Sequence, residues 1–417
     1  MAGAAVITGG DYLLELSTGY DASAFYLDDS LLDGPAVLDG DGVDYVDISD
    51  LVQDIQINRG RKRPRDVFGP GQMAVSINIP KTNRDLDPFN TSSIYYNTLT
   101  EQPGLAPLRD IRLSRDGDRI FTGKITTFNQ QYTMDGLTQY SLFAADDIYT
   151  LSQGFLAETA TSAETSSARI TAVLSAANYT GTTSLTASPI ATLGAYTIPS
   201  GTNVNAYLNR IQDAEQGRIF CSKSNVLTAQ SRTGTTLSPA VAVFSDTGLD
   251  INYDVLQVEF DQAPVINNSQ VTIEVGGTLQ TASNTASIAQ YFTQTSSITD
   301  SLLSTDGQAA TLATYLLVPL PLPRFTSIST SFVSLTDPQK VALTASEIGD
   351  TVSATKTFTT GTPLTITQDL SIEGIEHRIN VSTGHRVTIW TSATTVLSAL
   401  VLDDITYGII NSTNALG

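Results

Sequence analysis

Apolar and polar residues alternate along much of the chain between about residues 45 and 157. In residues 73–79 the apolar side chains recur at every second position, which is the period of a pleated strand. Residues 52–58 follow this period more weakly, with only Ile55 and Ile57 in phase. Asp116-Gly117 predicts a tight hairpin turn, because glycine adopts a positive φ at little cost. Further strands are predicted at 108–114, 119–126, 127–132 and 138–144, and Gly123 predicts a bulge or bend, so that a small antiparallel β-barrel is expected.

Residues 158–246 show a helical period in two places. Residues 162–177 place Ile170, Val173 and Leu174 on one stripe, and residues 203–216 form a second amphipathic stretch. Gly217 follows this second helix as a stop signal. A hairpin is predicted at 218–221 and 226–230, and residues 178–200 are expected to form a loop or an irregular β segment. The region is predicted to be a compact α+β module.

Strand patterns return after residue 247. One helix is predicted near 307–318, and it ends before Pro319, Pro321 and Pro323, which cannot continue a helix. The strands are predicted at 255–260, 271–275, 326–334, 351–359, 364–372, 377–382 and 385–391. The predicted fold class is mainly β, with two antiparallel β-barrel-like domains flanking a helix-hairpin domain. The predicted domains are an acidic N-terminal extension at 1–44, a first β-barrel at 45–157, the α+β module at 158–246, and a second β-rich barrel with one inserted helix at 247–417.

The charges are few, mostly negative and unevenly distributed. The 417 residues carry 22 Lys and Arg against 42 Asp and Glu, which gives a formal net charge of −20. Such an acidic chain is a poor ligand for DNA or for anionic lipid, because both are polyanions. Residues 1–58 contain twelve carboxylates and no Lys or Arg, whereas residues 59–65 hold five of the 22 cations.

This basic run is the strongest electrostatic feature of the sequence. It could form a nucleic-acid patch or a localisation signal, but it has no interleaved aromatic residues for base stacking. The favoured interpretation is an exposed loop between two strands that meets carboxylates on a neighbouring subunit. Charge reversal at Arg61 and Arg63 is then expected to leave the fold intact. The predicted interface residues are Arg59, Arg61, Lys62, Arg63 and Arg65.

Catalytic and metal-binding motifs find little support. Residues 39–50 are rich in Asp and could form a calcium loop, but the spacing departs from an EF-hand, and a solvated turn is favoured. Glu373, Glu376 and His377 are close in sequence, yet a strand would point Glu376 away from the other two. Cys221 lies in an apolar strand without an adjacent His and is interpreted as a small core residue. We therefore predict no enzyme activity, no catalytic, cofactor-binding or metal-ligating residues, no secretion signal and no membrane span.

Several runs of the sequence resemble a known group of proteins. Four segments, in this order along the chain, resemble minor tail proteins of siphophages infecting actinobacteria. They are Val46-Asp-Ile-Ser-Asp50, Ile57-Asn-Arg-Gly-Arg61, Phe68-Gly-Pro-Gly-Gln-Met-Ala-Val-Ser-Ile77 and Asp87-Pro-Phe-Asn-Thr91. Five other segments are similar to the wider family of tail-tip and baseplate hub proteins. They are the hairpin at 108–125, the segment Leu142-Phe-Ala-Ala-Asp-Asp-Ile-Tyr-Thr-Leu151, the module at 198–230, the strand at 372–377 and the segment at 402–408. The resemblance covers about 45–411 and leaves out roughly the first 40 residues and 178–200.

The resemblance implies a homotrimer whose paired barrels make a pseudo-sixfold ring, which matches a sixfold tail tube to a threefold tip. The expected function is that of a non-enzymatic tail-tip or baseplate hub protein that lets DNA pass. The expected partners are tail tube, distal tail, tape measure and tip or fibre proteins, with no sequence-specific nucleic acid. The expected location is the virion tail tip, after synthesis in the host cytoplasm. A hexameric distal tail protein and a carbohydrate-binding adhesin or depolymerase remain alternatives.

Overall fold

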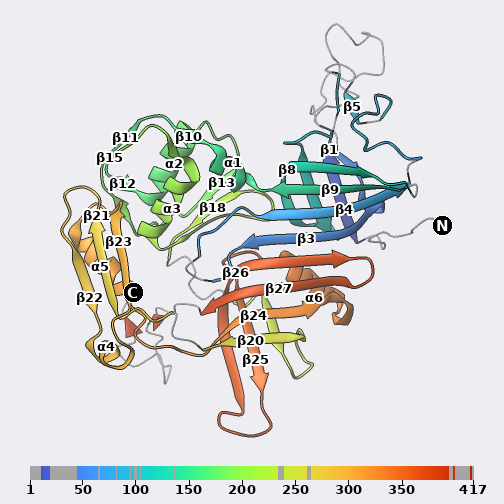
Figure 1. Ribbon diagram of the computed structural model, residues 1–417. Helices are drawn as coiled ribbons and strands as arrows, with labels where there is room; N and C mark the ends of the chain where they lie inside the picture. The colour runs from blue at the N-terminus through green and yellow to red at the C-terminus, as the bar shows by residue number, and fades with distance from the viewer. Residues whose placement is uncertain are drawn as a thin grey trace.

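The largest sheet contains thirteen of the 29 strands in the described residues. The computed structural model describes residues 11–18, 45–63, 66–80, 82–93, 95–97, 101–103, 105–134, 137–232, 239–260, 264–393, 398–399 and 414–415. Thirteen strands form the sheet, and its main path runs in the order β2-β1-β7-β8-β9-β4-β3-β26-β27-β24-β20, with β25 and β19 branching from β26. The pairs in this sheet are antiparallel except for β19 with β25. Figure 1 shows two β-rich bodies that meet where β3 and β26 lie side by side.

The first β body holds the N-terminal half of the sheet. In β4, the alternation of the sequence is matched by alternating burial, and Met73, Val75, Ile77 and Ile79 point into the core as predicted. The turn at Asp116-Gly117 is also confirmed, with φ values of 49° and 85°. Its strands are β1 (Tyr12–Ser17), β2 (Tyr45–Asp47), β3 (Val52–Gly60), β4 (Gln72–Pro80), β7 (Asp110–Arg115), β8 (Asp118–Tyr132) and β9 (Leu137–Ala145), with the short pair β5 (Tyr96–Asn97) and β6 (Gln102–Pro103) beside them.

The second β body continues the sheet beyond β26. Its core is a separate apolar cluster that includes Phe244, Phe332 and Ile389. Residues 364–372 and 377–382, predicted as two strands, belong to one long strand that bulges between Ile372 and Gly374. The elements are β19 (Ala242–Ser245), β20 (Val255–Glu259), β24 (Arg324–Ser331), α6 (Asp337–Ala345), β25 (Thr351–Thr357), β26 (Thr365–Asn380) and β27 (Gly384–Ala393), with the 3-10 turns η1 (Ser49–Leu51) in the first body and η2 (Phe332–Ser334) in this one.

The α+β module forms beside the first body (Figure 1). The side chain of Asn203 caps α3 by accepting from the Ala206 N–H at 3.0 Å, as an N-cap residue should. The helix ends one residue earlier than predicted, because Gln216, with φ of 53°, is its left-handed C-cap and Gly217 instead allows a close approach to the Gln230 carbonyl. The elements are α1 (Asp147–Gln153), β10 (Phe155–Leu156), β11 (Thr159–Thr161), β12 (Glu164–Thr165), α2 (Ser166–Ala176), β13 (Thr183–Leu185), β14 (Thr192–Leu193), β15 (Tyr196–Ile198), β16 (Thr202–Asn203), α3 (Val204–Glu215), β17 (Arg218–Cys221) and β18 (Leu227–Gln230).

A small lobe, residues 264–323, packs against the module and shares its core through Val271, Leu302 and Leu312. The predicted helix at 307–318 is present as α5, which ends at Tyr315 because the chain turns back to pair Val318 with Ile266. The elements are β21 (Asn268–Ile273), β22 (Gln280–Ser283), α4 (Thr285–Tyr291), β23 (Thr295–Ser301) and α5 (Asp306–Tyr315). Two further short strands, β28 (Ser398–Ala399) and β29 (Asn414–Ala415), pair with each other.

The overall class is mainly β, as predicted, but the expected barrels are not closed within the described residues. The path of pairing is open, with β2 and β20 at its ends. Residues 127–132, predicted as a separate strand, continue β8 past a register shift between Ile125 and Thr127. The physical reason for the open path is the pairing of β3 with β26 over seven registered residue pairs, which makes one shared sheet out of two.

Candidate interface and buried charge network

The basic run begins at the end of β3, on the seam between the two β bodies. Strand alternation buries Ile55, Ile57 and Arg59 on the same face, and Arg59 is only 3% exposed. Its guanidinium Nη1 donates to Glu347 Oε1 at 2.6 Å. A buried cation is tolerated when such a partner compensates it. Arg59 is therefore a charged residue of the core.

Two glycines allow the backbones to close at this seam. Gly60 has a φ of +82°, and a Cβ atom there would lie 2.3 Å from the Glu373 carbonyl oxygen. Opposite it on β26, a Cβ on Gly374 would lie 2.6 Å from the Arg61 carbonyl oxygen. Only glycine combines the positive φ of residue 60 with so close an approach of the two backbones. The approach brings the side chains of Arg61 and Glu373 together.

Glu373 is the centre of the buried network. Its carboxylate accepts from Arg61 Nε at 2.7 Å, from Arg218 Nη2 at 2.6 Å and from the Ser392 hydroxyl at 2.6 Å. Its side chain is 2% exposed, and those of Arg61 and Arg218 are 11% and 10% exposed. Burial alone would raise the pKa of Glu373, but the charges and hydrogen bonds of Arg218 and Arg61 hold that pKa below its ordinary value. One carboxylate thus ties together β3, β17 and β26.

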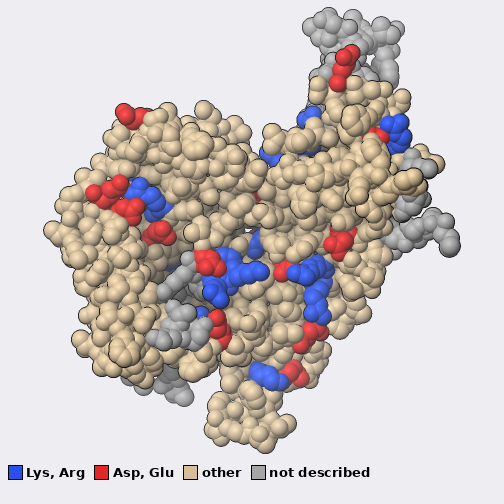
Figure 2. Space-filling model, in the orientation of Figure 1, with Lys and Arg blue, Asp and Glu red and all other residues tan. Residues whose placement is uncertain are grey.

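The other cations of the predicted cluster differ in their surroundings. The Lys62 and Arg63 side chains are exposed, and the Lys62 ammonium lies 4.8 Å from the centre of the Trp390 ring. The Arg61 guanidinium, in contrast, covers the Phe68 ring at 4.3 Å. Arg65 lies outside the described residues. Figure 2 shows blue and red side chains side by side near the centre of the visible face.

The pairing of Arg59 and Arg61 therefore differs from the expected picture of an exposed loop. Their carboxylates, Glu347 and Glu373, belong to the same chain. The expectation that reversing Arg61 and Arg63 leaves the fold intact assumed exposed side chains, and that assumption is wrong for Arg61, which is buried against Glu373. The assignment of the basic run to a subunit or tail-protein contact stays a prediction, and Lys62 and Arg63 are the described cations left exposed to make it.

A second polar cluster joins the two bodies at β1. The Tyr12 hydroxyl lies 2.8 Å from His385 Nδ1, and His385 Nε2 lies 3.0 Å from His377 Nδ1. Both imidazoles are 3% exposed. Burial lowers the pKa of His377 to about 3, with Arg59 and Lys223 adding to the effect. Burial, His377 and Arg115 likewise lower the pKa of His385. The pair is a neutral structural contact at neutral pH.

The remaining candidate residues have structural surroundings. Cys221 is 2% exposed, and burial followed by Asp146 and Asp147 raises the pKa of its thiol well above the usual value. Of the Asp-rich segment, residues 39–44 lie outside the described residues, and Asp47 accepts from the Ser49 N–H at 2.9 Å. Among the residues described, no group of three or more His, Cys, Asp or Glu side chains is arranged to hold a metal ion. None of the described helices is both long and apolar enough to cross a membrane.

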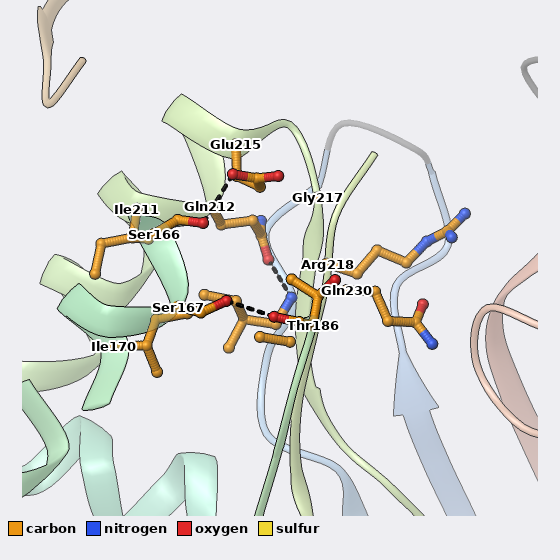
Figure 3. Close-up of a pocket in the computed structure, with 12 residues that line it drawn as sticks. Ser166, Ser167, Ile170, Thr186, Ile211, Gln212, Glu215, Gly217, Arg218 and Gln230 are labelled. Carbon is orange, nitrogen blue, oxygen red and sulfur yellow. Dashed lines mark hydrogen bonds between the residues drawn. The ribbon is translucent and has the colours of Figure 1, made fainter. Parts of the chain in front are cut away.

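The best-formed pocket lies in the α+β module between α2, α3 and β18 (Figure 3). Its cavity volume of about 10 Å³ leaves room for little more than one water molecule, far below the roughly 300–1,000 Å³ that small-molecule sites occupy. Some of its polar groups already have partners, since Ser166 donates to Glu215 at 2.8 Å and the Ile219 N–H donates to Gln212 at 2.9 Å. Figure 3 shows Arg218 pointing to the other side of β17, toward the seam.

Sequence reasoning missed the residues that complete the network around Arg59 and Arg61. Glu347 and Arg218 carried no motif, and Glu373 was weighed only as a catalytic candidate. The single usable signal was the sequence Glu373-Gly374, because a glycine inside a strand indicates close approach by another backbone. The partners are separated by 288 to 312 residues, so no local pattern could pair them.

Comparison with solved structures gives matches over nearly the full chain. The 43 kDa tail protein of prophage MuSo2 from Shewanella oneidensis matches with a TM-score of 0.58 and 10% identity, over 92% of this chain and 98% of that chain. The tail protein from Neisseria meningitidis MC58 matches with a TM-score of 0.58 and 12% identity, over 91% and 96%. Prophage tail protein gp18 from Listeria monocytogenes EGD-e matches with a TM-score of 0.51 and 10% identity, over 92% and 95%. The chain therefore has the fold of these tail proteins.

No protein-family model matches the sequence, and no curated protein matches it either.

Proposed function

We propose that this chain is a structural, non-enzymatic component of a phage tail that acts as a tail-tip or baseplate hub. The observation that carries the proposal is the extent of the structural likeness: three proteins described as tail proteins match it over 91–92% of its length. A likeness over 95–98% of those chains includes the module and both β bodies, so it is not limited to one common β motif. The sequence resemblance to minor tail proteins points the same way.

The joined β bodies support the hub role within that proposal. Three copies of a chain that carries two β bodies would supply six bodies around one axis, which suits a junction between a sixfold tube and a threefold tip. Closed rings also leave no unpaired heterologous surface. The seam at β3 and β26, fixed by Gly60, Gly374 and Glu373, would set the angle between the two bodies of each copy.

The charge of the chain also suits this role. A net charge of −20 keeps DNA from adhering during passage, since contacts with phosphates need Lys or Arg. The buried cations Arg59, Arg61 and Arg218 form ion pairs with Glu347 and Glu373, so they are not available to bind phosphates. We include the actinobacterial siphophage type in the proposal on the sequence resemblance alone.

The copy number of the chain tests this function. Purified tails, digested and quantified against isotope-labelled peptides of this chain and of the tube protein, should contain three copies of the chain per tail, however many sixfold rings the tube has. Antibody labelling should place those copies at the end of the tail distal to the capsid. Six copies would assign the chain to a distal tail ring instead, and absence from tails would reject the proposal. Binding or cleavage of host glycans by the purified chain would favour the adhesin alternative.

A further inference from the structure

The lobe at residues 264–323 has an unusual distribution of charge. The sequence has no Lys or Arg between Arg232 and Arg324, and residues 275–299 contain no charged residue at all. The acids at the inner end of the lobe, Glu274 and Asp300, both pair with Arg210 of α3. Figure 2 shows the lower left of the visible face, where α4 and β22 lie, without charged side chains. The outer end of the lobe is thus uncharged.

At this uncharged end, α4 finishes in a strained and exposed aromatic residue. Phe292 has a φ of +56° and is 83% exposed. A bulky side chain at positive φ is a conformational outlier. Such strain persists only where the surroundings impose it, and it concentrates at functional positions. Phe292 gains almost nothing from burial, so the fold presents this ring to solvent at a cost in stability.

A fully buried side chain imposes this conformation. Asn267 is 0% exposed, and its Nδ2 donates to the Phe292 carbonyl oxygen at 2.7 Å and to Ser287 Oγ at 3.2 Å. Its Oδ1 accepts from the Gln294 N–H at 2.7 Å. The Asn267 amide therefore holds the backbone on both sides of Phe292. The backbone that carries the ring is therefore fixed before any partner binds.

A second rigid segment lies next to α4. Ser287 Oγ donates to the Pro319 carbonyl oxygen at 2.5 Å, which holds the Pro319-Leu-Pro-Leu-Pro323 segment against α4. Leu320 is 49% exposed and Leu322 is 72% exposed. Alternate prolines fix φ and lower the conformational entropy that binding would remove. We call Phe292, Leu320 and Leu322 the apolar tip.

The chemistry of the apolar tip restricts what can bind it. Nucleic acid and anionic membranes need cations, and the lobe has none. A preorganised aromatic residue in a charge-depleted patch is instead typical of the centre of a protein interface. A second copy of the chain is a poor receptor, because the two best-formed pockets on the described residues measure about 230 and 180 Å³ of largely open space and contain room for little more than a water molecule.

We propose that the apolar tip docks into an uncharged, apolar pocket on a different protein of the tail, with Phe292 as the anchor. This inference rests on the proposed function, since it takes the partner from the same particle. The lobe then serves as the attachment arm of the chain, separate from the β bodies that would form the ring.

The test uses complete tails assembled with variants of this chain. Phe292→Ala should reduce incorporation of the chain into tails at least tenfold, whereas the control Phe89→Ala, which removes a ring that is 79% exposed outside the lobe, should leave incorporation unchanged. Phe292→Gly should also reduce incorporation tenfold, while the thermal midpoint of the purified chain stays equal or rises, because glycine adopts the positive φ without strain. This pair of results separates a docking role from a folding defect.

A photo-crosslinking residue in place of Phe292 identifies the occupant. In assembled tails it should link to one different tail protein, and the same residue in place of Phe89 should not. Links to a second copy of this chain, links to glycan or lipid, or normal incorporation of Phe292→Ala without any link would overturn the inference and leave the proposed function standing. Absence of the unaltered chain from tails would instead reject the proposed function and this inference with it.

Discussion

Replacing Glu373 by Gln should destabilise the protein strongly, because among the described residues this carboxylate is the one anion that forms direct ion pairs with both Arg61 and Arg218. The substitution keeps the volume of the side chain and removes its charge. Arg61 retains a bond to the Asp66 carbonyl oxygen and Arg218 retains one to Ser371 Oγ, but neither bond is to an anion. Both cations would then remain buried without a compensating charge.

The expected loss follows from the burial of the network. Removing one partner of a buried ion pair costs about 3–5 kcal/mol, and here the three side chains are 2%, 11% and 10% exposed. A matched control is Glu259→Gln, because the Glu259–Arg324 pair is longer, at 3.4 Å, and both side chains are 26% exposed. An exposed pair of this kind contributes about 0–1 kcal/mol. The two Glu-to-Gln variants should therefore differ by roughly 2–5 kcal/mol in the free energy of unfolding.

Urea unfolding at pH 7 measures this difference. Trp390 is the single tryptophan and lies on β27 beside Lys62, so its fluorescence reports on the seam directly. Circular dichroism followed in parallel shows whether the whole chain unfolds in the same transition. A loss of less than 1 kcal/mol for Glu373→Gln, equal to that of Glu259→Gln, would refute the argument that buried charges fix the seam.

Acid pH should reveal the same interaction. The pKa of Glu373 is lower in the folded state than in the unfolded state, so its stabilisation is complete above the unfolded pKa and is lost as the pH falls through the folded pKa. The unaltered protein should lose stability relative to Glu373→Gln across that acid window. A difference in unfolding free energy between the two proteins that stays constant from pH 7 down to the acid transition would contradict the lowered pKa of Glu373.

Three further variants test other parts of the structure. Gly60→Ala should lower the free energy of unfolding in urea by about 2 kcal/mol or more, because the alanine would have a positive φ and would clash with β26. The control Gly117→Ala has a similar φ but open space around it, so it should lower that free energy by only about 1 kcal/mol. Equal losses would contradict the close approach of the two strands. Burial raises the pKa of Asp146 to about 7, so ionisation of this carboxyl opposes folding. As the pH rises from about 4 to 7, the unaltered protein should therefore lose stability relative to Asp146→Asn. Parallel pH profiles of the unfolding free energy for the two proteins would exclude this pKa shift. Charge reversal of Lys62 and Arg63 together should change the free energy of unfolding by about 1 kcal/mol or less and should reduce tail assembly, and normal assembly would remove the interface assignment.

Local patterns predicted the elements whose signals are local. The alternation of apolar and polar residues in 73–79 identifies β4 as a strand, because one of its faces is buried. The helix after Asn203 is identified by its N-cap residue and its apolar stripe. The strand β1 was not predicted, because it lies in the segment interpreted as an acidic extension. One of its neighbours in the sheet, β7, is nearly 100 residues away. Helix α4 has one buried residue, Ser287, and so lacks the apolar period that identifies a helix.

The site could be predicted only in part, because its two halves are far apart in sequence. The five cations of residues 59–65 were evident from composition, and the need for nearby carboxylates followed from Coulomb repulsion. Which carboxylates meet them depends on the pairing of β3 with β26, whose register is set by the fold as a whole. Ser371 and Glu373 lie on the face of β26 opposite Ile372 and both bond to Arg218, so both faces of the strand are buried here, which the local sequence does not reveal.

The symmetry of the assembled tail tip tests the central claim most directly. A cryo-electron microscopy map of intact tails should contain three copies of this chain around the tail axis, with the two β bodies of each copy alternating to give six similar positions in one ring. The β3–β26 seam should lie within each copy, and Lys62 and Arg63 should face a neighbouring subunit. Six copies around the axis, or a tail tip without this chain, would contradict the hub assignment.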